Sequence, residues 1–331
     1  MTLHELFLPT IARWLGLLAL AALIGGLVVD LLVLPRGTAA LTSVRECLRR
    51  WTTLAVVVLI LTSAADAIVR ARIMSGGDLA QGAAALPIVL ARTHFGAIWI
   101  ARAVALALLL IVSASRAAVT RAAGLALAVG VALTSSLTGH AADFGDLSPS
   151  VLVDWLHGVA AMAWTGGLFA LALTMGRARD AWPSELVGVA ARRFSRLAGY
   201  CVVLVLASGI YNAWVEVPSF AALWTTTYGG ALAVKVALAL AIVAIGAVNR
   251  YRVLPRLGAT GAGVKLTQLV AREALIAVVV FGCTAVLAES TPKRHESHMS
   301  HIGPRLYWSH SNRLLRRGQH SAPDGLRRDR H

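Results

Sequence analysis

Charged side chains are scarce in this sequence of 331 residues: they make up 14% of the chain, whereas hydrophobic residues make up 57%. The mean hydropathy of +0.71 excludes an ordinary water-soluble domain, because such a domain contains far more polar residues. Cysteine is also rare, and Cys47, Cys201 and Cys283 are too widely separated for a zinc motif or a disulfide framework. Most of the chain is therefore expected to lie in lipid.

Long apolar runs are abundant, and each approaches the roughly 20 residues that a helix needs to cross a bilayer. The runs are rich in Ala, Leu and Val and lack the alternation of barrel strands, which favours helices. The first run has no basic segment before it, so we expect it to be retained as a helix and not cleaved. We predict an all-α, polytopic membrane helical bundle with eight transmembrane helices at residues 10–34, 51–69, 95–114, 118–139, 151–174, 197–214, 228–248 and 270–288.

The net charge of +15 raises the question of nucleic-acid binding, but the basic residues are in short loops between the apolar runs and in the C-terminal tail. We therefore predict no nucleic-acid partner. Basic loops mark the cytoplasmic side of a membrane protein, which places both termini outside. The loop residues that give this orientation are Arg36, Arg45, Arg49, Arg50, Arg116, Arg121, Arg177, Arg179, Arg192, Arg193, Arg196, Arg250, Arg252, Arg256 and Lys265.

An internal repeat is visible in the first helix of each half. WLGLLALAALIGGL begins at Trp14 and WLHGVAAMAWTGGL begins at Trp155, and in both nine residues separate Trp-Leu from Gly-Gly-Leu. We predict two parallel four-helix repeats, residues 1–148 and 149–290, followed by a basic, His-rich tail at 291–331 that is disordered. The paired glycines are expected to let the two first helices approach closely.

Histidines and acids gather on the predicted outer side of the membrane. His140 ends the fourth helix, His94 precedes the third, and His157 lies in the fifth, where the first half has Gly16. Asp154 shares a helical face with His157, and Asp143 lies in the short loop between His140 and the fifth helix. Imidazole ligands favour a transition-metal ion such as copper, and polar groups inside a membrane are usually functional. Hydrogen bonding between helices is the alternative for His140 and His157, and simple solvation at the interface is the alternative for His94.

Two basic residues lie well inside predicted helices. Arg102 and Lys235 occupy equivalent places in the two halves, and Asp66 and Glu216 are acids available to pair with them. Structural ion pairing and a gating or proton-coupled role both remain open for these four residues. Asp30 and Glu273 are near the predicted inner face, where we expect loop arginines to pair with them.

The sequence resembles the copper resistance protein CopD family of bacterial membrane proteins. The resemblance is found in GHAA from Gly139, LHGVAAMAWTGGL from Leu156, RFSRLA from Arg193, TTTYGGALAVK ending at Lys235 and NRYRVLP from Asn249. It implies eight helices in the inner membrane, copper uptake, and a periplasmic copper-binding partner of the CopC type. It also implies that His140 and His157 are the main copper ligands.

Copper uptake is thus the expected function, with copper as substrate or ligand and no enzymatic activity. We expect the ion to be captured at the outer His/Asp site and to pass between the two repeats. Two alternatives stay open. A haem-b or quinone-reactive membrane protein would need axial histidines, and His94, His140 and His157 could provide them on one side only. A copper chaperone for oxidase assembly would need the outer site but no path through the membrane.

Overall fold

The computed structural model describes residues 3–76, 78–113, 115, 117–177, 182, 184–216, 227–256 and 262–289. Eight helices among these residues are long and apolar enough to cross a membrane, which confirms the predicted all-α, multi-pass bundle. The tail at 291–331 lies outside the described residues. The eight helices are α1 (Leu3–Val28), α2 (Thr42–Ser75), α4 (His94–Ser113), α5 (Ala118–Ser136), α6 (Pro149–Arg177), α7 (Ser184–Glu216), α9 (Thr227–Val248) and α10 (Ala262–Glu289).

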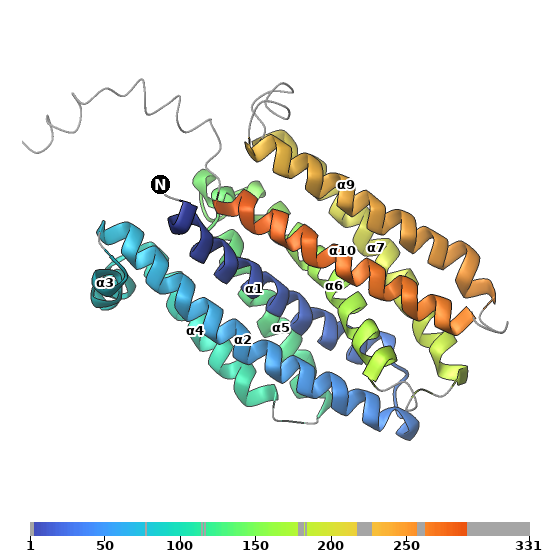
Figure 1. Ribbon diagram of the computed structural model, residues 1–331. Helices are drawn as coiled ribbons and strands as arrows, with labels where there is room; N and C mark the ends of the chain where they lie inside the picture. The colour runs from blue at the N-terminus through green and yellow to red at the C-terminus, as the bar shows by residue number, and fades with distance from the viewer. Residues whose placement is uncertain are drawn as a thin grey trace, which may run out of the picture. The chain divides into compact units, whose positions relative to one another are not determined.

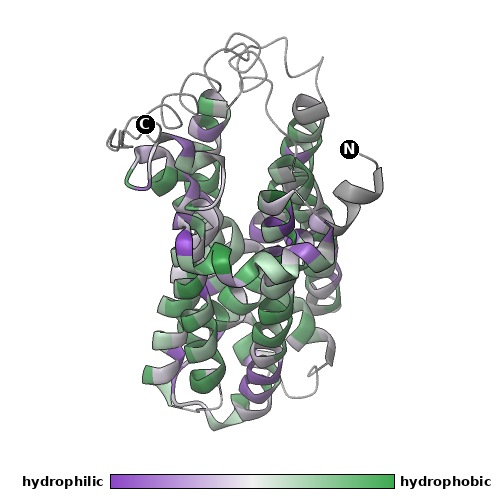
Figure 2. Ribbon diagram, turned by 90° about the vertical axis from the view of Figure 1, so that its left-hand side faces the viewer, coloured by the Kyte–Doolittle hydropathy of each residue, from purple (hydrophilic) through white to green (hydrophobic). Residues whose placement is uncertain are grey.

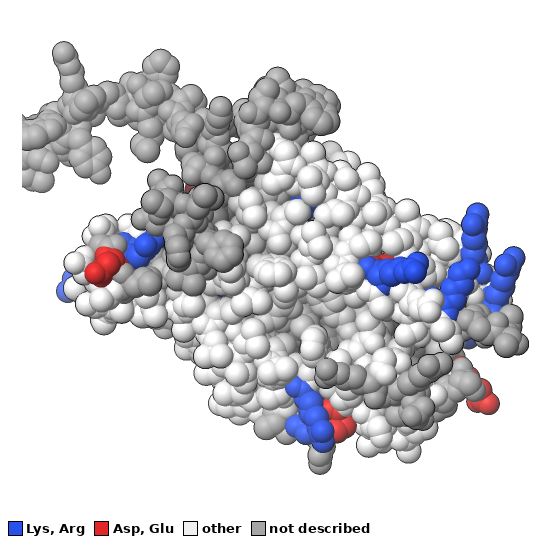
Figure 3. Space-filling view, in the orientation of Figure 1, with Lys and Arg blue, Asp and Glu red and all other residues white. Residues whose placement is uncertain are grey.

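The long helices run side by side, so that their connections collect at two ends of the bundle (Figure 1). One end contains the short 3-10 helix η3 (His140–Phe144), and we call it the η3 end. The other contains the 3-10 helix η2 (Ala39–Leu41), and we call it the η2 end. Apolar residues predominate along the helices (Figure 2), and on the face shown in Figure 3 most charged atoms lie toward the ends. This distribution is what a bilayer around the middle of the bundle requires.

Helix α3 (Leu79–Arg92) is one element that the sequence analysis did not predict. It lies at the η3 end, roughly across the direction of the long helices (Figure 1). Asp78 caps its start by accepting a hydrogen bond from the Gln81 amide at 2.8 Å. With 14 residues it is too short to cross the bilayer, and it connects α2 to α4.

Helices α1 and α6 pack together at the glycine pairs that the repeat contains. A methyl group added to Gly25 would lie 1.9 Å from the Gly166 carbonyl carbon, so the two backbones are in direct contact there. The second glycine of each pair faces another helix: Gly26 faces Thr52 of α2, and Gly167 faces Phe194 of α7. The predicted close approach of the two helices is thus confirmed.

The tryptophans that begin the two repeat segments make equivalent contacts. Trp14 of α1 donates a hydrogen bond to the Val278 carbonyl of α10 at 3.0 Å, and Trp155 of α6 donates to the Val129 carbonyl of α5 at 3.0 Å. In each case the first helix of one predicted repeat bonds to the last helix of the other. These contacts agree with two related halves, and the repeat itself stays a prediction.

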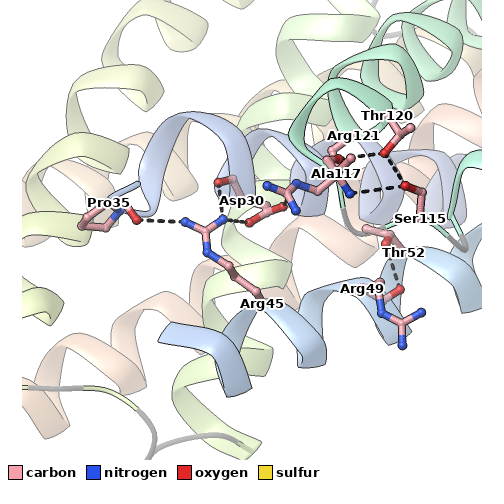
Figure 4. Close-up of polar contacts among 9 residues, drawn as sticks. All are labelled: Asp30, Pro35, Arg45, Arg49, Thr52, Ser115, Ala117, Thr120 and Arg121. Atoms are coloured by element: carbon pink, nitrogen blue, oxygen red, sulfur yellow. Dashed lines mark hydrogen bonds and ion pairs between the residues drawn. The ribbon is translucent and has the colours of Figure 1, made fainter. Parts of the chain in front are cut away.

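A buried acid joins three helices near the η2 end. Asp30 lies in a π-helical turn, η1 (Val29–Val33), that ends α1, and it is only 6% exposed. Figure 4 shows it between Arg45 of α2 and Arg121 of α5; the Arg121 Nε lies 2.7 Å from Asp30 Oδ2. Arg45 also donates to the Pro35 carbonyl at 2.8 Å. The predicted pairing of Asp30 with loop arginines is therefore confirmed.

We expect Asp30→Asn to lower the free energy of unfolding by about 2 kcal/mol, because it leaves two partly buried guanidinium groups without their shared carboxylate. Thermal unfolding of the purified protein in detergent would measure this. Glu46→Gln is the matched control, since Glu46 pairs with Arg49 and Arg50 and is more exposed than Asp30. Equal losses in the two variants would contradict the role assigned to Asp30.

Candidate functional site

His157 lies between α6 and α7. Its Nδ1 atom is 3.0 Å from the Ser208 hydroxyl, and the adjacent Gly209 provides space: a methyl group there would lie 3.3 Å from the imidazole Cε1. In the first half the corresponding place is filled differently, because Gly16 of α1 lies against the Thr62 hydroxyl of α2. At the position that the predicted repeat makes equivalent, the chain thus has an imidazole in place of a packed glycine.

The hydrogen bonds of Ser208 orient this imidazole. The Ser208 hydroxyl donates to the Leu204 carbonyl at 2.5 Å, so its oxygen is left to accept a hydrogen bond from His157 Nδ1–H. This arrangement favours the tautomer in which Nε2 has no proton and offers its lone pair. A histidine whose second nitrogen is held by a hydrogen bond in this way is suited to ligate a metal ion.

Asp154 lies one helical turn before His157 and contacts α5. Its Oδ2 accepts a hydrogen bond from the Ser136 hydroxyl at 2.6 Å. Immediately before Ser136, two more α5 hydroxyls face Arg102 of α4, which donates to Ser135 at 3.3 Å and approaches Thr134 at 3.5 Å. Hydroxyl groups of one α5 turn therefore connect the surroundings of Arg102 with those of Asp154.

Arg102 has further partners that stabilise its charge within the bundle. Its Nε donates to the Ser63 hydroxyl of α2 at 3.1 Å, and its guanidinium carbon lies 5.1 Å from the centre of the Trp99 ring. We define the polar layer as these side chains together with Lys235 of α9, which is half-buried. Its members are Ser63, Arg102, Thr134, Ser135, Ser136, Asp154, His157, Ser208 and Lys235.

The basic groups of the polar layer occupy similar places along their helices. Arg102, His157 and Lys235 each follow the first residue of their helix by eight positions, about 12 Å along the helix axis. Lys235 and Asp154 are the charges that act on the His157 ring most strongly. The imidazole is therefore between a repulsive and an attractive charge for any bound cation.

The remaining predicted ligands, and the two acids predicted as partners for the buried basic residues, are arranged less compactly. His94 Nε2 is 2.9 Å from Asp146 Oδ2, and both side chains are largely exposed. Asp143 is exposed in η3, and Asp66 lies 3.7 Å from Arg70 of its own helix. The His140 and Glu216 side chains lie outside the described residues. Among the side chains that are described, no three of His, Cys, Asp and Glu form a cluster that could hold a metal ion.

Two partners of the site were not found by sequence reasoning. Ser208 and Gly209 are in α7, 51 and 52 positions after His157, and Ser and Gly in an apolar helix carry no distinctive signal.

Glu273 was expected to pair with a loop arginine, and this was wrong: Asn249 donates to its carboxylate instead. Asn249 belongs to the NRYRVLP segment, which sequence reasoning used only as a mark of resemblance.

Two segments of the chain match known families. Residues 4–149 match the Copper resistance protein D-like, N-terminal domain, and residues 188–287 match Copper resistance protein D. The chain belongs to the copper resistance protein D family. Helix α6 with His157 and Asp154 lies almost entirely between the two matched segments.

Curated relatives share part of this chain. It is similar to the copper transport protein CutJ of Bacillus subtilis, with 34% identity over 120 residues, 36% of this chain and 22% of CutJ. It is also similar to the inner membrane protein YebZ of Escherichia coli, with 34% identity over 102 residues, 31% of this chain and 34% of YebZ. The aligned part is thus about a third or less of either relative. No solved structure matches the chain.

Proposed function

We propose that this protein moves copper ions across the bacterial inner membrane and that His157 receives the ion. The observation that supports this most directly is the Ser208 contact, which holds Nδ1 of an intramembrane imidazole and so favours the tautomer whose Nε2 can ligate a metal ion. Membership of the copper resistance protein D family and similarity to a copper transport protein support copper as the ion. Imidazole is also a ligand that copper accepts readily.

Asp154 and the other predicted ligands would complete the site. Asp154 lies one turn before His157 and offers a carboxylate, and His140, Asp143 and His94 belong to the same end of the bundle. In the proposed orientation this end faces the periplasm, where a CopC-type protein would deliver copper. Capture at the η3 end then precedes passage through the membrane.

The proposed route does not run directly between α1 and α6 at the level of Gly25. Their backbones are in contact there, so an ion could pass only if the two helices separated. The face of α6 that contains His157 continues through Trp164 and Leu168 toward the η2 end. We propose that the ion follows this face, on the side of α6 where α7 and α10 pack.

Lys235 is proposed to limit occupancy of the site. Its positive charge opposes a cation at His157, so Lys235→Met should raise the affinity of the protein for copper(I) by about tenfold. Titration against a chromophoric copper(I) chelator would measure this affinity. An unchanged or weaker affinity in the variant would show that Lys235 does not act on the bound ion.

Copper uptake by proteoliposomes tests the proposed function. Vesicles that contain the full chain should accumulate copper(I) faster than protein-free vesicles, and excess Mg²⁺ should not compete, because it prefers oxygen ligands. Equal accumulation in both kinds of vesicle would contradict transport. Copper binding without accumulation would point to the chaperone alternative, and a Soret band would point to haem.

A further inference from the structure

Each half of the bundle has a partly open cavity toward the η2 end. The first cavity, of about 220 Å³, is lined by residues of α1, α2, α4 and α5. The second, of about 360 Å³, is lined by residues of α6, α7 and α10, the end of α9, and the turns that follow it, η5 (Asn249–Val253) and η6 (Leu254–Arg256). Each cavity has one deeply buried acid in its wall: Asp30 in the first and Glu273 in the second. The two acids provide a comparison within one molecule.

The acid of the first cavity is neutralised by the protein. Asp30 pairs with both Arg45 and Arg121, so two positive charges surround one carboxylate. A metal cation entering this cavity would meet these guanidinium groups as well as the acid. The first cavity is therefore unsuited to hold a cation.

The acid of the second cavity has a different neighbour. Glu273 is 2% exposed, and its described hydrogen bond comes from the neutral Asn249 amide. Arg250 also lines this cavity, but its guanidinium donates to the Ser195 carbonyl at 2.8 Å. A carboxylate buried beside a neutral partner is costly, and a bound cation would remove that cost.

A second polar atom of this cavity has no partner among the described residues. Asn249 is 7% exposed, and its side-chain oxygen Oδ1 accepts no hydrogen bond there. Met175 of α6 is 5% exposed and lines the same cavity. The lining of this cavity thus includes a carboxylate, an unsatisfied amide oxygen and a thioether.

From this juxtaposition we infer that Glu273, Asn249 and Met175 form a second copper site, toward the η2 end. The inference rests on the proposed function, since the thioether selects copper(I) only if copper enters the protein. One sulfur and two oxygen ligands hold copper(I) weakly, which suits a site that must release its ion. The amide and carboxylate alone would favour harder cations, so Met175 determines the choice of metal.

Helix α6 connects the proposed second site to His157. His157, Trp164, Leu168, Leu171 and Met175 recur at spacings of three, four or seven residues and so follow one face of the helix. From His157 to Met175 the helix rises about 27 Å, which nearly spans the hydrocarbon core of roughly 30 Å. The two sites would therefore lie near opposite faces of the membrane.

Copper(I) stoichiometry of the purified full chain in nanodiscs tests the inference. We expect two ions per chain in the wild type, one in Glu273→Gln, one in His157→Ala and none in the double variant. Glu273→Gln should also slow uptake into proteoliposomes at least tenfold. Because glutamine keeps the size and can still accept from Asn249, this variant should fold.

Met175→Leu removes the sulfur at nearly constant volume and should also lose one ion. Met162→Leu is its matched control, since Met162 is equally buried in α6 but does not line the cavity. If Glu273→Gln and Met175→Leu both keep two ions and full uptake, the second site is overturned while the proposed function stands. If the wild type binds no copper(I), the proposed function itself has failed.

Discussion

Replacing His157 with alanine should reduce copper uptake into proteoliposomes at least tenfold. The Ser208 contact favours the tautomer whose Nε2 can ligate a metal ion, and nothing in an alanine side chain can replace this ligand. Ser208→Ala should have a smaller effect, because it keeps the ligand but removes the hydrogen bond that orients the ring. Loss of such a supporting bond weakens metal binding by about tenfold at the lower end of its usual range, and we expect a loss of copper affinity of this size in Ser208→Ala.

Thr62→Val is a matched control for the serine variant. Thr62 donates to the Val58 carbonyl at 2.9 Å, as Ser208 does to Leu204, but it faces Gly16 and no histidine. We expect Thr62→Val to transport copper like the wild type. If Ser208→Ala and Thr62→Val reduce copper affinity equally, the serine acts through helix packing and not through His157. Unchanged uptake by His157→Ala would contradict the role of His157 as a copper ligand.

Gly25→Ala should destabilise the folded bundle by at least about 3 kcal/mol. The added methyl group would meet backbone atoms of Gly166 and Gly167 at 1.9 to 2.4 Å, and a backbone cannot rotate away as a side chain can. Helices α1 and α6 would have to separate along much of their length. A lower melting temperature and loss of the monodisperse peak in size-exclusion chromatography would report this.

Gly130→Ala in α5 is the corresponding control. A methyl group at Gly130 would have no neighbour within 4 Å among the described residues, so the variant should keep or slightly raise the melting temperature. A similar drop in both variants would mean that any side chain added to these glycines is harmful, whatever its surroundings. The assigned contact between α1 and α6 would then lose its support.

Hydropathy was sufficient to predict the eight spans because each depends on a long local run of apolar residues. It placed the start of α2 at residue 51, whereas the helix begins at Thr42, because its first turns contain Arg45, Glu46, Arg49 and Arg50. These turns extend beyond the apolar run, so hydropathy cannot detect them. Helix α3 was missed because it is short and contains Pro87, which is typical of a loop.

The candidate site was predictable only in part. Spacing along one helix placed Asp154 and His157 on a common face, since that relation depends on helical geometry alone. The contacts with Ser136 and Ser208 depend on which helices are neighbours, and no local pattern contains that information. The same applies to Glu273, whose partner Asn249 comes from a different helix of the bundle.

The contact between Gly25 and Gly166 also restricts how the protein can move. If α1 slid along α6 by one turn, about 5.4 Å, Gly25 would face Met162 or Ala170, whose side chains would force the backbones apart. Sliding is thus opposed in both directions, whereas tilting about the glycine crossing keeps the backbones in contact. The contact between α1 and α6 can therefore act as a pivot. Separation of the two helices at one end of the bundle would then be coupled to their approach at the other end.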